Sequence, residues 1–346
     1  MAVGYWLRDR AVRDRRLLPG ALGRQAEGGQ GRSCFMNKPI VVVGSLNADL
    51  VTRLQRFPIP GETLTADDFH VFAGGKGANQ AYAASRLGGV VHMVGRVGRD
   101  SYGKRLIEEL QGGGVNTCEV ALDDGAATGM AFVSVDASGQ NQIVIVAGSN
   151  AAVSANNLVE SAELLASAGC VLLQLEIPVP AVLVAARMAK AGGARVILDP
   201  APAAELPDEL LQLVDWLTPN ETELSRLLRL TPSNAMDVDQ IVSCARKLQQ
   251  RGVKQVVVKR GDAGVLCLSG HTTDSWPAFR VEAHDTVAAG DVWNGAFAVG
   301  LSEGESPENA GRFANAAASL SVTRPGAQAS MPSRSEVTKF LSRSVL

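Results

Sequence analysis

The most informative residues are Asp285–Asp291 (Asp-Thr-Val-Ala-Ala-Gly-Asp), which precede the apolar run Val292–Phe297. Small residues before an apolar run predict a tight loop that opens onto a helix. The free N–H groups and the dipole at a helix start attract an anion, although a carboxylate beside a bound phosphate would repel it. Phosphoryl transfer uses both features, with the amides holding the phosphoryl group and Asp291 accepting the proton of the attacking hydroxyl. The alternative is an aspartate that caps a helix after a glycine turn.

A second glycine-rich segment is Ala73–Gln80 (Ala-Gly-Gly-Lys-Gly-Ala-Asn-Gln). It is not a Walker A loop, because glycine follows Lys76 where serine or threonine is required, and it lacks the glycine spacing of a dinucleotide fingerprint. Gly74 and Gly75 allow the backbone to approach a ligand closely, while Lys76 and Asn79 supply donors suited to a polyol. The alternative is a glycine-rich lead-in to a helix.

Polar side chains follow the ends of two expected strands. Asn47 and Asp49 come after the apolar run 40–43, and Glu176 follows the run 171–175. Ligands bind beyond the carboxyl ends of parallel strands, so these acceptors could hold the hydroxyl groups of a sugar. Asn and Asp also favour turns for purely structural reasons.

A third polar group follows Pro219. Asn220 and Glu223 either cap a helix or reach Mg²⁺ and its waters beside a nucleotide phosphate. Further on, Gly261–Gly264 follows Lys259 and predicts a turn between two strands, along which a nucleotide could lie. The four histidines lack partners at metal-ligand spacing, so a histidine metal site is not expected.

The elements that must position these residues alternate between strand and helix. We expect strands at 40–43, 90–97, 171–175, 196–198, 215–217, 255–259 and 264–268. Helices are expected at 78–87, 101–112 with Asp100 as cap, 180–191, 221–228, 238–250 and from 290 onward. This alternation predicts an α/β fold with three α/β/α layers and a mostly parallel central sheet. Hairpin signals add a small β-hairpin lid at roughly 49–72 and 119–146.

Composition bounds the classes of partner. The 346 residues are 46% hydrophobic and 20% charged, with a net charge of −2, which is typical of a soluble globular protein. The composition gives no sign of a basic surface, so a nucleic-acid partner is not expected. No apolar run approaches about 18 residues, so no membrane span is expected.

Cysteine usage and the N-terminal segment bear on location. The five cysteines are scattered and never in a C-x-x-C arrangement, which favours a reducing cytoplasm over a disulfide framework. Residues 1–35 are arginine-rich, end in a glycine-rich stretch and show no clean periodicity. We expect a disordered extension before a kinase domain at 36–346. Organelle targeting stays open, although Asp9, Asp14 and Glu27 argue against a transit peptide.

Five segments together resemble the ribokinase-type family of carbohydrate kinases, over about residues 39–332. They are Val43–Asp49, Ala73–Gln80, Asn220–Glu223, Asp285–Asp291 and Val322–Gln328. The pairing of Gly-Gly-Lys-Gly-Ala-Asn with a late Asp-Thr-x-x-Ala-Gly-Asp is highly specific. The resemblance implies ATP-dependent phosphorylation of D-ribose at O5, giving D-ribose 5-phosphate, by a homodimer joined through the lid.

The resemblance also implies a role for each matching residue. Catalysis would use Asp291 as base and an anion hole of Ala288, Ala289 and Gly290. The sugar would be held by Asn47, Asp49, Gly74, Gly75, Lys76, Asn79, Glu176 and Asp291. ATP would be held by Asn220, Glu223, Lys259, Gly261, Gly264, Gly290 and Asn315, with Glu223 near Mg²⁺ or another divalent cation. An activating K⁺ would lie among Asp285, Val287, Ser321, Arg324, Gly326 and Ser330, bound mostly by backbone carbonyls.

The chain departs from the family's usual pattern in places, and other functions stay open. Lys259-Arg260-Gly261-Asp262 replaces a Thr-Leu-Gly-Ser-like turn, and Ala288 stands where many members have glycine.

One alternative function is that of a kinase for another small sugar or nucleoside, such as 2-deoxyribose or fructose. Asn47 favours ribose, because a polar group placed for a 2-hydroxyl is left unpaired by deoxyribose. Another is a catalytically silent sugar-binding regulator, which would not need a base. A dinucleotide-dependent oxidoreductase is disfavoured by the missing G-x-G-x-x-G.

Overall fold

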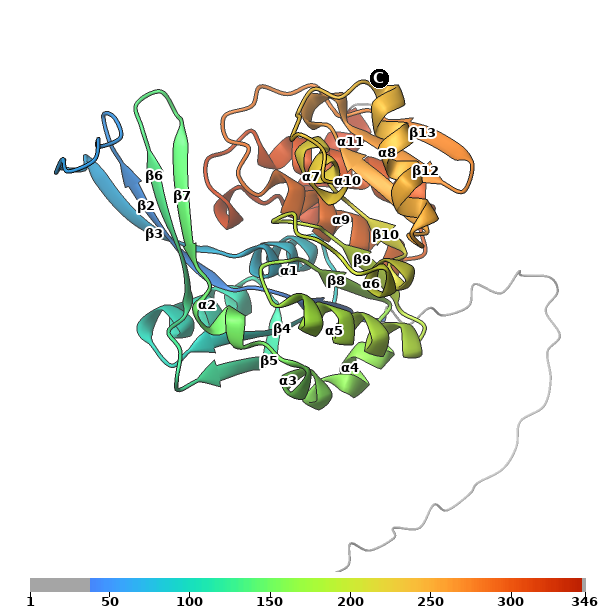
Figure 1. The fold of residues 1–346 in the computed structure, drawn as a ribbon, viewed down its shortest axis with the longest axis horizontal. Helices are drawn as coiled ribbons and strands as arrows, with labels where there is room; N and C mark the ends of the chain where they lie inside the picture. The colour runs from blue at the N-terminus through green and yellow to red at the C-terminus, as the bar shows by residue number, and fades with distance from the viewer. Residues whose placement is uncertain (1–37, 344–346) are drawn as a thin grey trace, which may run out of the picture. The chain divides into compact units, whose positions relative to one another are not determined.

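The structure is a computed structural model that describes residues 38–343, so the predicted N-terminal extension lies outside the described residues. Within that range the strands form two sheets (Figure 1). The central sheet has nine strands in the order β13-β12-β11-β10-β9-β8-β1-β4-β5. Their bounds are β1 Ile40–Val43, β4 Val91–Gly98, β5 Asn116–Asp123, β8 Cys170–Leu173, β9 Arg195–Leu198, β10 Trp216–Leu217, β11 Gln255–Lys259, β12 Val265–Ser269 and β13 Thr272–Trp276.

The central sheet is mostly parallel, as the alternation of strands and helices predicted. Every adjacent pair from β11 to β5 is parallel, and only β12 runs antiparallel to its two neighbours. The carboxyl ends of the parallel strands therefore meet at one edge of the sheet, where ligands bind in folds of this kind.

Helices cover both faces of the central sheet, so the three-layer α/β/α prediction is confirmed. Their bounds are α1 Lys76–Arg86, α2 Ser101–Gly112, α3 Ala155–Glu160, α4 Ala162–Ser167, α5 Val179–Ala191, α6 Asp208–Leu213, α7 Glu221–Leu227, α8 Val238–Gln250, α9 Ala289–Ser302, α10 Pro307–Ser321 and α11 Arg334–Arg343. Short 3₁₀ turns lie at η1 Gly148–Ala152, η2 Gly261–Ala263 and η3 Gln328–Ser330.

The two hydrophobic cores follow from the alternation of side chains along each strand. Ile40 and Val42 of β1 face the core that includes α1, α2, α9 and α10. Val41 and Val43 face the opposite core, with α5, α7 and α8. All four side chains are fully buried, which explains why this strand is an unbroken apolar run.

The lid is a second, four-stranded sheet in the order β3-β2-β6-β7. Its strands are β2 Asn47–Arg53, β3 Asp68–Gly74, β6 Gly129–Val135 and β7 Asn141–Val146, and Figure 1 shows them projecting from the central sheet beside α1 and α2. The predicted lid range 119–146 was too wide, because residues 119–123 belong to β5 of the central sheet. β5 lies at the edge of the sheet, and several of its positions are polar and exposed. Its sequence therefore lacks the apolar run that predicts a central strand.

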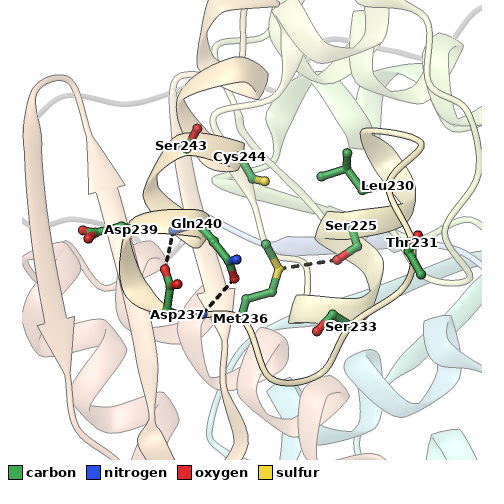
Figure 2. A pocket seen from close by; sticks show the side chains of 10 residues that line it. All are labelled: Ser225, Leu230, Thr231, Ser233, Met236, Asp237, Asp239, Gln240, Ser243 and Cys244. Carbon is green, nitrogen blue, oxygen red and sulfur yellow. Dashed lines mark hydrogen bonds between the residues drawn. The ribbon is translucent and has the colours of Figure 1, made fainter.

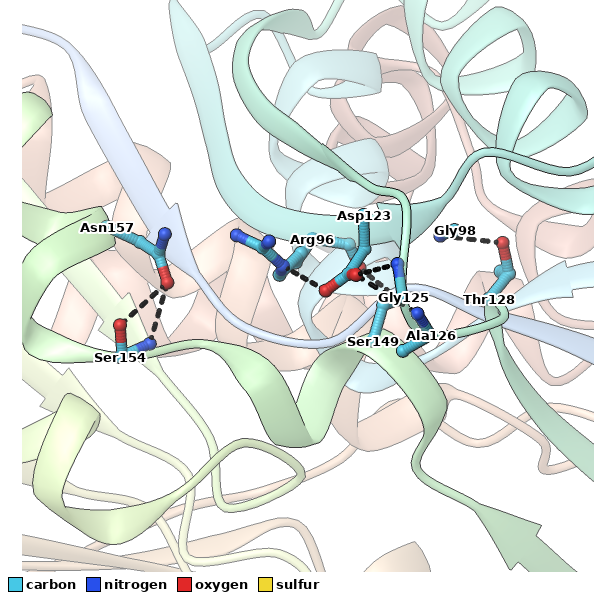
Figure 3. Close-up of polar contacts among 9 residues, drawn as sticks. All are labelled: Arg96, Gly98, Asp123, Gly125, Ala126, Thr128, Ser149, Ser154 and Asn157. Carbon is cyan, nitrogen blue, oxygen red and sulfur yellow. Dashed lines mark hydrogen bonds and ion pairs between the residues drawn. The ribbon is translucent and has the colours of Figure 1, made fainter.

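Polar contacts anchor the lid where the chain passes from β5 to β6 (Figure 3). The Nε of Arg96 in β4 pairs with Oδ2 of Asp123 at 2.5 Å, and the Oδ1 of Asp123 accepts the N–H groups of Gly125 and Ala126. The hydroxyl of Thr128 then accepts the N–H of Gly98 at 3.0 Å. These contacts fix the direction in which β6 leaves the central sheet.

The start of α1 is packed against the turn that follows β1. Gly75 has φ of 86°, and a Cβ added to it would lie 2.8 Å from the backbone N of Asn47. The N–H of Ala78 donates to the carbonyl of Ser45 at 2.9 Å. Glycine is needed here both for its positive φ and for this close approach. Among residues 38–343, no helix is long and apolar enough to cross a membrane.

Candidate active site

Asp291 lies in the first turn of α9 and is only 5% exposed. Its Oδ2 accepts from Nδ2 of Asn79 at 3.1 Å, and its Oδ1 accepts from Nε2 of Gln80 at 3.0 Å. Burial raises the pKa of Asp291 to about 6, although the charge of Lys76 opposes this rise. A carboxylate with this pKa is ionised at neutral pH and is a better proton acceptor than an ordinary aspartate.

The N-terminus of α9 leaves backbone donors free. Ala288 precedes the helix with φ of 58°, a left-handed conformation that costs a non-glycine residue about 1–2 kcal/mol. Within residues 38–343, the N–H groups of Ala288, Gly290 and Asp291 have no hydrogen-bond acceptor, whereas the N–H of Ala289 reaches the carbonyl of Thr286 at 3.3 Å. This turn thus has the free donors and the helix dipole that an anion site requires.

Lys76 is the cation at the centre of the site. Burial by itself lowers the pKa of its ammonium group, but four surrounding carboxylates outweigh that effect and raise the pKa above its usual value. In order of influence they belong to Asp291, Asp199, Glu176 and Glu223. The structure therefore brings residues from four distant parts of the sequence around one ammonium group.

A second ammonium group lies at the start of α9. The Nζ of Lys259, at the carboxyl end of β11, pairs with Oδ1 of Asp199 at 2.9 Å, and the side chain of Asp199 is 2% exposed. A Cβ added to Gly290 would lie 3.4 Å from this Nζ. The predicted nucleotide residue Lys259 is thus placed beside the predicted anion hole.

Asn47 lies at the start of the lid strand β2 and is 3% exposed. Its Oδ1 accepts from Nδ2 of Asn150 at 2.7 Å, and its Nδ2 lies 3.5 Å from Oε2 of Glu176. Asn150 also exchanges two hydrogen bonds with the backbone of Leu46. Sequence reasoning missed Asn150, because no local pattern links η1 to a turn about a hundred residues earlier.

Asp49 faces the same region as Asn47, two residues further along β2. Burial first, and then the charges of Glu176 and Asp291, raise the pKa of Asp49 to about 7. Its carboxylate covers Gly74 of the neighbouring strand, where an added Cβ would lie 2.1 Å from Oδ2. Glycine is therefore required at position 74, because the Asp49 carboxylate lies so close to its backbone. The same carboxylate is a strong acceptor for a hydroxyl group.

Glu176 has a structural task that the sequence did not reveal. Its Oε2 accepts the N–H of Lys76 at 3.0 Å and the hydroxyl of Ser45. These contacts tie the end of β8 to the start of α1 and to the turn after β1. Any contact of Glu176 with a sugar would be additional to this role.

Asn220 and Glu223 form a helix cap. The Oδ1 of Asn220 accepts the N–H of Glu223 at 2.8 Å, and Oε2 of Glu223 accepts the N–H of Asn220 at 2.8 Å. The structural alternative is therefore present, but it does not exclude the nucleotide role. Burial raises the pKa of Glu223, with Lys259 opposing the rise and Asp199 adding to it. Glu223 thus belongs to the same charged cluster.

Three predicted nucleotide residues lie outside this cluster. Asn315 is buried, with Nδ2 donating to the carbonyls of Trp276 and Pro277 and Oδ1 accepting from Nε1 of Trp293 at 2.8 Å. Gly261 has φ of 57° and open space around it, while Gly264 has φ of 80° and would clash with the carbonyl of Trp276 if it carried a Cβ. The side-chain groups of Asn315 are therefore occupied by structural hydrogen bonds.

The predicted cation residues lie on two loops that Asp285 joins. Its Oδ1 accepts the N–H of Val287 at 2.9 Å, and its Oδ2 accepts the N–H of Gly326 at 2.8 Å. The hydroxyls of Ser321 and Ser330 donate to carbonyls of their own turns, and the guanidinium of Arg324 pairs with Glu336. The side-chain donors are thus engaged in local contacts, and the cation site remains a prediction.

The structure also brings in residues to which the sequence reasoning gave no role. Asp199 directly follows β9, as Gln174 directly follows β8, whereas Glu176 lies three residues beyond the end of β8. That placement was a usable signal. Gln80 gave none, because no local pattern marks a buried amide that lies between two carboxylates.

A surface cavity of about 590 Å³ lies elsewhere, between α7 and α8 (Figure 2). Its polar side chains serve local structure: Asp237 caps α8 by accepting the N–H of Gln240 at 2.7 Å, and the hydroxyl of Ser225 lies 3.4 Å from the sulfur of Met236. None of the predicted site residues lines it. We therefore assign the chemistry to the charged cluster around Asp291.

Several known proteins resemble this chain over most of its length. Residues 37–334 match the sequence model of the pfkB family of carbohydrate kinases. A ribokinase of Haemophilus influenzae is 41% identical over 306 residues, which cover 88% of this chain and 99% of that protein. A deoxyribokinase of Salmonella typhi is 36% identical over 304 residues, which cover 88% of this chain and 98% of that protein.

The fold matches solved structures closely. A structure of Arabidopsis thaliana ribokinase complexed with ribose and ATP aligns with a TM-score of 0.84 and 41% identity. The alignment covers 88% of this chain and 99% of that one.

Proposed function

The chain belongs to the pfkB family of carbohydrate kinases, and from that premise we propose that it transfers the γ-phosphoryl group of ATP to O5 of D-ribose. The products are ADP and D-ribose 5-phosphate. One observation carries the proposal: the buried carboxylate of Asp291 lies beside the free N–H groups that begin α9, and Asn79 of the predicted sugar loop donates to it at 3.1 Å. The relative solved with ribose and ATP supports the choice of substrates.

In this mechanism Asp291 accepts the proton of the 5-hydroxyl. The O5 oxygen then forms a bond to the γ-phosphorus as the bond to the bridging oxygen of ADP breaks. The amides of Asn79 and Gln80 hold the carboxylate in one orientation. The base is thus already aligned before the substrate arrives, which is a main source of rate enhancement in such reactions.

Negative charge on the transferring group would be met by fixed donors. The free N–H groups of Ala288 and Gly290 would form the anion hole together with that of Ala289, which also reaches the carbonyl of Thr286 at 3.3 Å. The ammonium group of Lys259 lies beside Gly290. Donors that need no rearrangement stabilise a transition state far better than water does. Asn220, Gly261, Gly264 and Asn315 would line the rest of the nucleotide site.

We expect two metal ions, Mg²⁺ and K⁺, although residues 38–343 contain no group of three or more His, Cys, Asp or Glu side chains that could hold a metal ion by itself. Mg²⁺, when bound, would neutralise charge on the nucleotide phosphates. Glu223 would reach it or its waters, since a nearby cation favours the ionised form of a carboxyl whose pKa is raised by burial. K⁺ would be held by carbonyls of the two loops that Asp285 joins, and it would fix the loop leading into the anion hole.

The sugar would be held by Asn47, Asp49, Lys76 and Asn79, with Gly74 and Gly75 allowing close approach. The long 3.5 Å contact of Asn47 with Glu176 leaves its amide able to donate to a sugar hydroxyl. Deoxyribose would leave that donor unpaired, at a cost of about 1–3 kcal/mol.

The similarity to a deoxyribokinase makes 2-deoxyribose the second candidate substrate. A coupled assay that follows ADP release, with ³¹P NMR of the product, tests both sugars. Ribose should have the higher kcat/KM by roughly 5- to 150-fold. An equal or higher kcat/KM for deoxyribose would overturn the assignment to ribose.

The lid supports a homodimer. Large apolar side chains are exposed on its strands: Phe69, Phe72, Phe132, Ile143, Val144, Ile145 and Val146. Cross-strand pairing places Phe132 and Val144 on one face of the sheet, and Phe72 and Ile145 on the face that carries Asp49. A small sheet that is apolar on both faces needs a partner surface, and a second lid supplies one. A cytoplasmic location stays a prediction.

A further inference from the structure

Gln80 is a buried amide placed between two carboxylates. It is completely buried in α1, one residue after Asn79. Its Nε2 donates to Oδ1 of Asp291 at 3.0 Å and to Oδ2 of Asp199 at 2.9 Å. Both hydrogens of one amide nitrogen are therefore used, one for each carboxylate.

The orientation of this amide is fixed by its partners. Ionised carboxylates only accept hydrogen bonds, so the nitrogen of Gln80 must face them. Its Oε1 then accepts from Nε2 of Gln174 at 2.7 Å. Gln174 in turn packs against Gly44, where an added Cβ would lie 2.0 Å from its Oε1. A glycine at the end of β1 thus makes room for the side chain that fixes Gln80.

Charged groups from several elements act on the Asp291 carboxylate. Lys76 on α1 favours its ionised form, and Asp199 after β9 disfavours it. Asp49 on the lid is a further negative group, and Lys259 on β11 neutralises part of the charge of Asp199. Gln80 is the neutral donor that lies between the carboxylates of Asp291 and Asp199.

We propose that Gln80 is a positioning residue for the general base: it holds the Asp291 carboxylate in its reactive orientation and shields it from Asp199. Gln174 supports this role by fixing the amide of Gln80. The inference rests on the proposed kinase function, and it adds a residue that acts only through Asp291. Since Gln80 is fully buried, it has no exposed surface with which to bind sugar or nucleotide.

The test replaces the amide by a side chain of similar length without donors, Gln80→Met. Losing a hydrogen bond to a charged group should move the acidic limb of the kcat profile to higher pH by about one unit. At pH 7 this shift alone should lower kcat about twofold. The lost orientation of the carboxylate should bring the total fall to roughly tenfold, while KM for ribose and ATP should change less than about threefold. The matched control is Gln111→Met on α2, which removes an amide hydrogen bond to Thr117 of β5. It should leave the profile unchanged.

A second variant covers the case in which Gln80→Met does not fold. Gln174→Met keeps the two donors of Gln80 but frees its carbonyl, and it should shift the acidic limb in the same direction by a smaller amount. A loss of kcat without any movement of the acidic limb in the folded variants would overturn the proposal. So would a rise in KM that accounts for the loss of kcat/KM.

A readout without catalysis separates this inference from the proposed function. Carboxyl ¹³C NMR of aspartate-labelled protein reports the titration of Asp291, assigned through its absence in Asp291→Asn. Gln80→Met should raise the titration midpoint by about one pH unit, and an unchanged midpoint would refute the role of Gln80. If the wild type instead phosphorylates no sugar, the kinase proposal fails whatever the NMR result.

Discussion

Lys259 and Asp199 form a buried ion pair, with Nζ 2.9 Å from Oδ1, directly beside Gly290 at the start of α9. The ammonium group of Lys259 can also turn to a phosphate that enters the same space. The pair joins the nucleotide side of the site to the base, because Asp199 shares the amide of Gln80 with Asp291.

Replacing the ammonium group should weaken binding of the terminal phosphates. We expect Lys259→Met to raise Kd for ATP roughly tenfold, the cost of one charge-assisted hydrogen bond, and to leave Kd for AMP nearly unchanged. Calorimetric titration with both nucleotides measures this difference. The matched control is Lys254→Met at the other end of β11, where the ammonium pairs with Asp215 at 2.7 Å. Equal losses for ATP and AMP would show that Lys259 does not contact the terminal phosphates.

Removing the base should separate binding from turnover. Asp291→Asn should lower kcat by roughly 10²–10⁴-fold and leave ribose affinity within a few-fold of wild type. Steady-state kinetics and ribose titration measure the two effects. The exposed Asp274→Asn is the control and should keep full activity. A loss of turnover below twofold would rule out Asp291 as the base and favour a silent binding protein.

The buried base should also make stability depend on pH. Since burial raises the pKa of Asp291 from 3.8 to about 6, the protonated form is favoured by folding. Its contribution to the free energy of unfolding is fully present below about pH 3.8 and is lost as pH rises through about 6, by roughly 3 kcal/mol in total.

Thermal unfolding of wild type and Asp291→Asn from pH 4.5 to pH 7 tests this linkage. The melting temperature of the wild type should fall relative to that of the variant as pH rises. A constant difference across the series would mean that Asp291 titrates alike in the folded and unfolded states.

Potassium should activate the enzyme through the loops that Asp285 joins. Exchange of K⁺ for N-methylglucamine at constant ionic strength should lower kcat at least tenfold, because the anion-hole donors lose their fixed positions. Asp285→Ala should show low activity with little response to K⁺, since the contact to Gly326 is lost. Identical rates of the wild type in both buffers would contradict the cation site.

A charge on the lid should dissociate the proposed dimer. Val144 on β7 is 64% exposed, and Val144→Lys should give a monomer by light scattering after size-exclusion chromatography. The control is Val159→Lys on α3, where the valine is 61% exposed but lies outside the lid. A wild-type monomer at micromolar concentration, or a dimer that survives Val144→Lys, would count against association through this surface.

Local patterns predicted most of the scaffold. The apolar run of β1 and the bounds of α8 and β11 agree with the structure, and Asp100 caps α2 as expected. These features depend on periodicity and on hydrogen bonds within a few residues, which a sequence displays directly. The edge strand β13 was missed, because its residues Thr272–Trp276 are mostly polar and exposed.

The sequence by itself determined which residue types are available for phosphoryl transfer, and that they follow strand ends or begin helices. Only the tertiary structure decided which of these residues can take part in the reaction and which hold other residues in position. Glu176 ties α1 to the turn after β1, Asn150 fixes the lid strand, and Gln80 links Asp291 to Asp199. These contacts join residues about 100 to 200 positions apart. Their geometry depends on how whole layers pack, and no local pattern of residues records that packing.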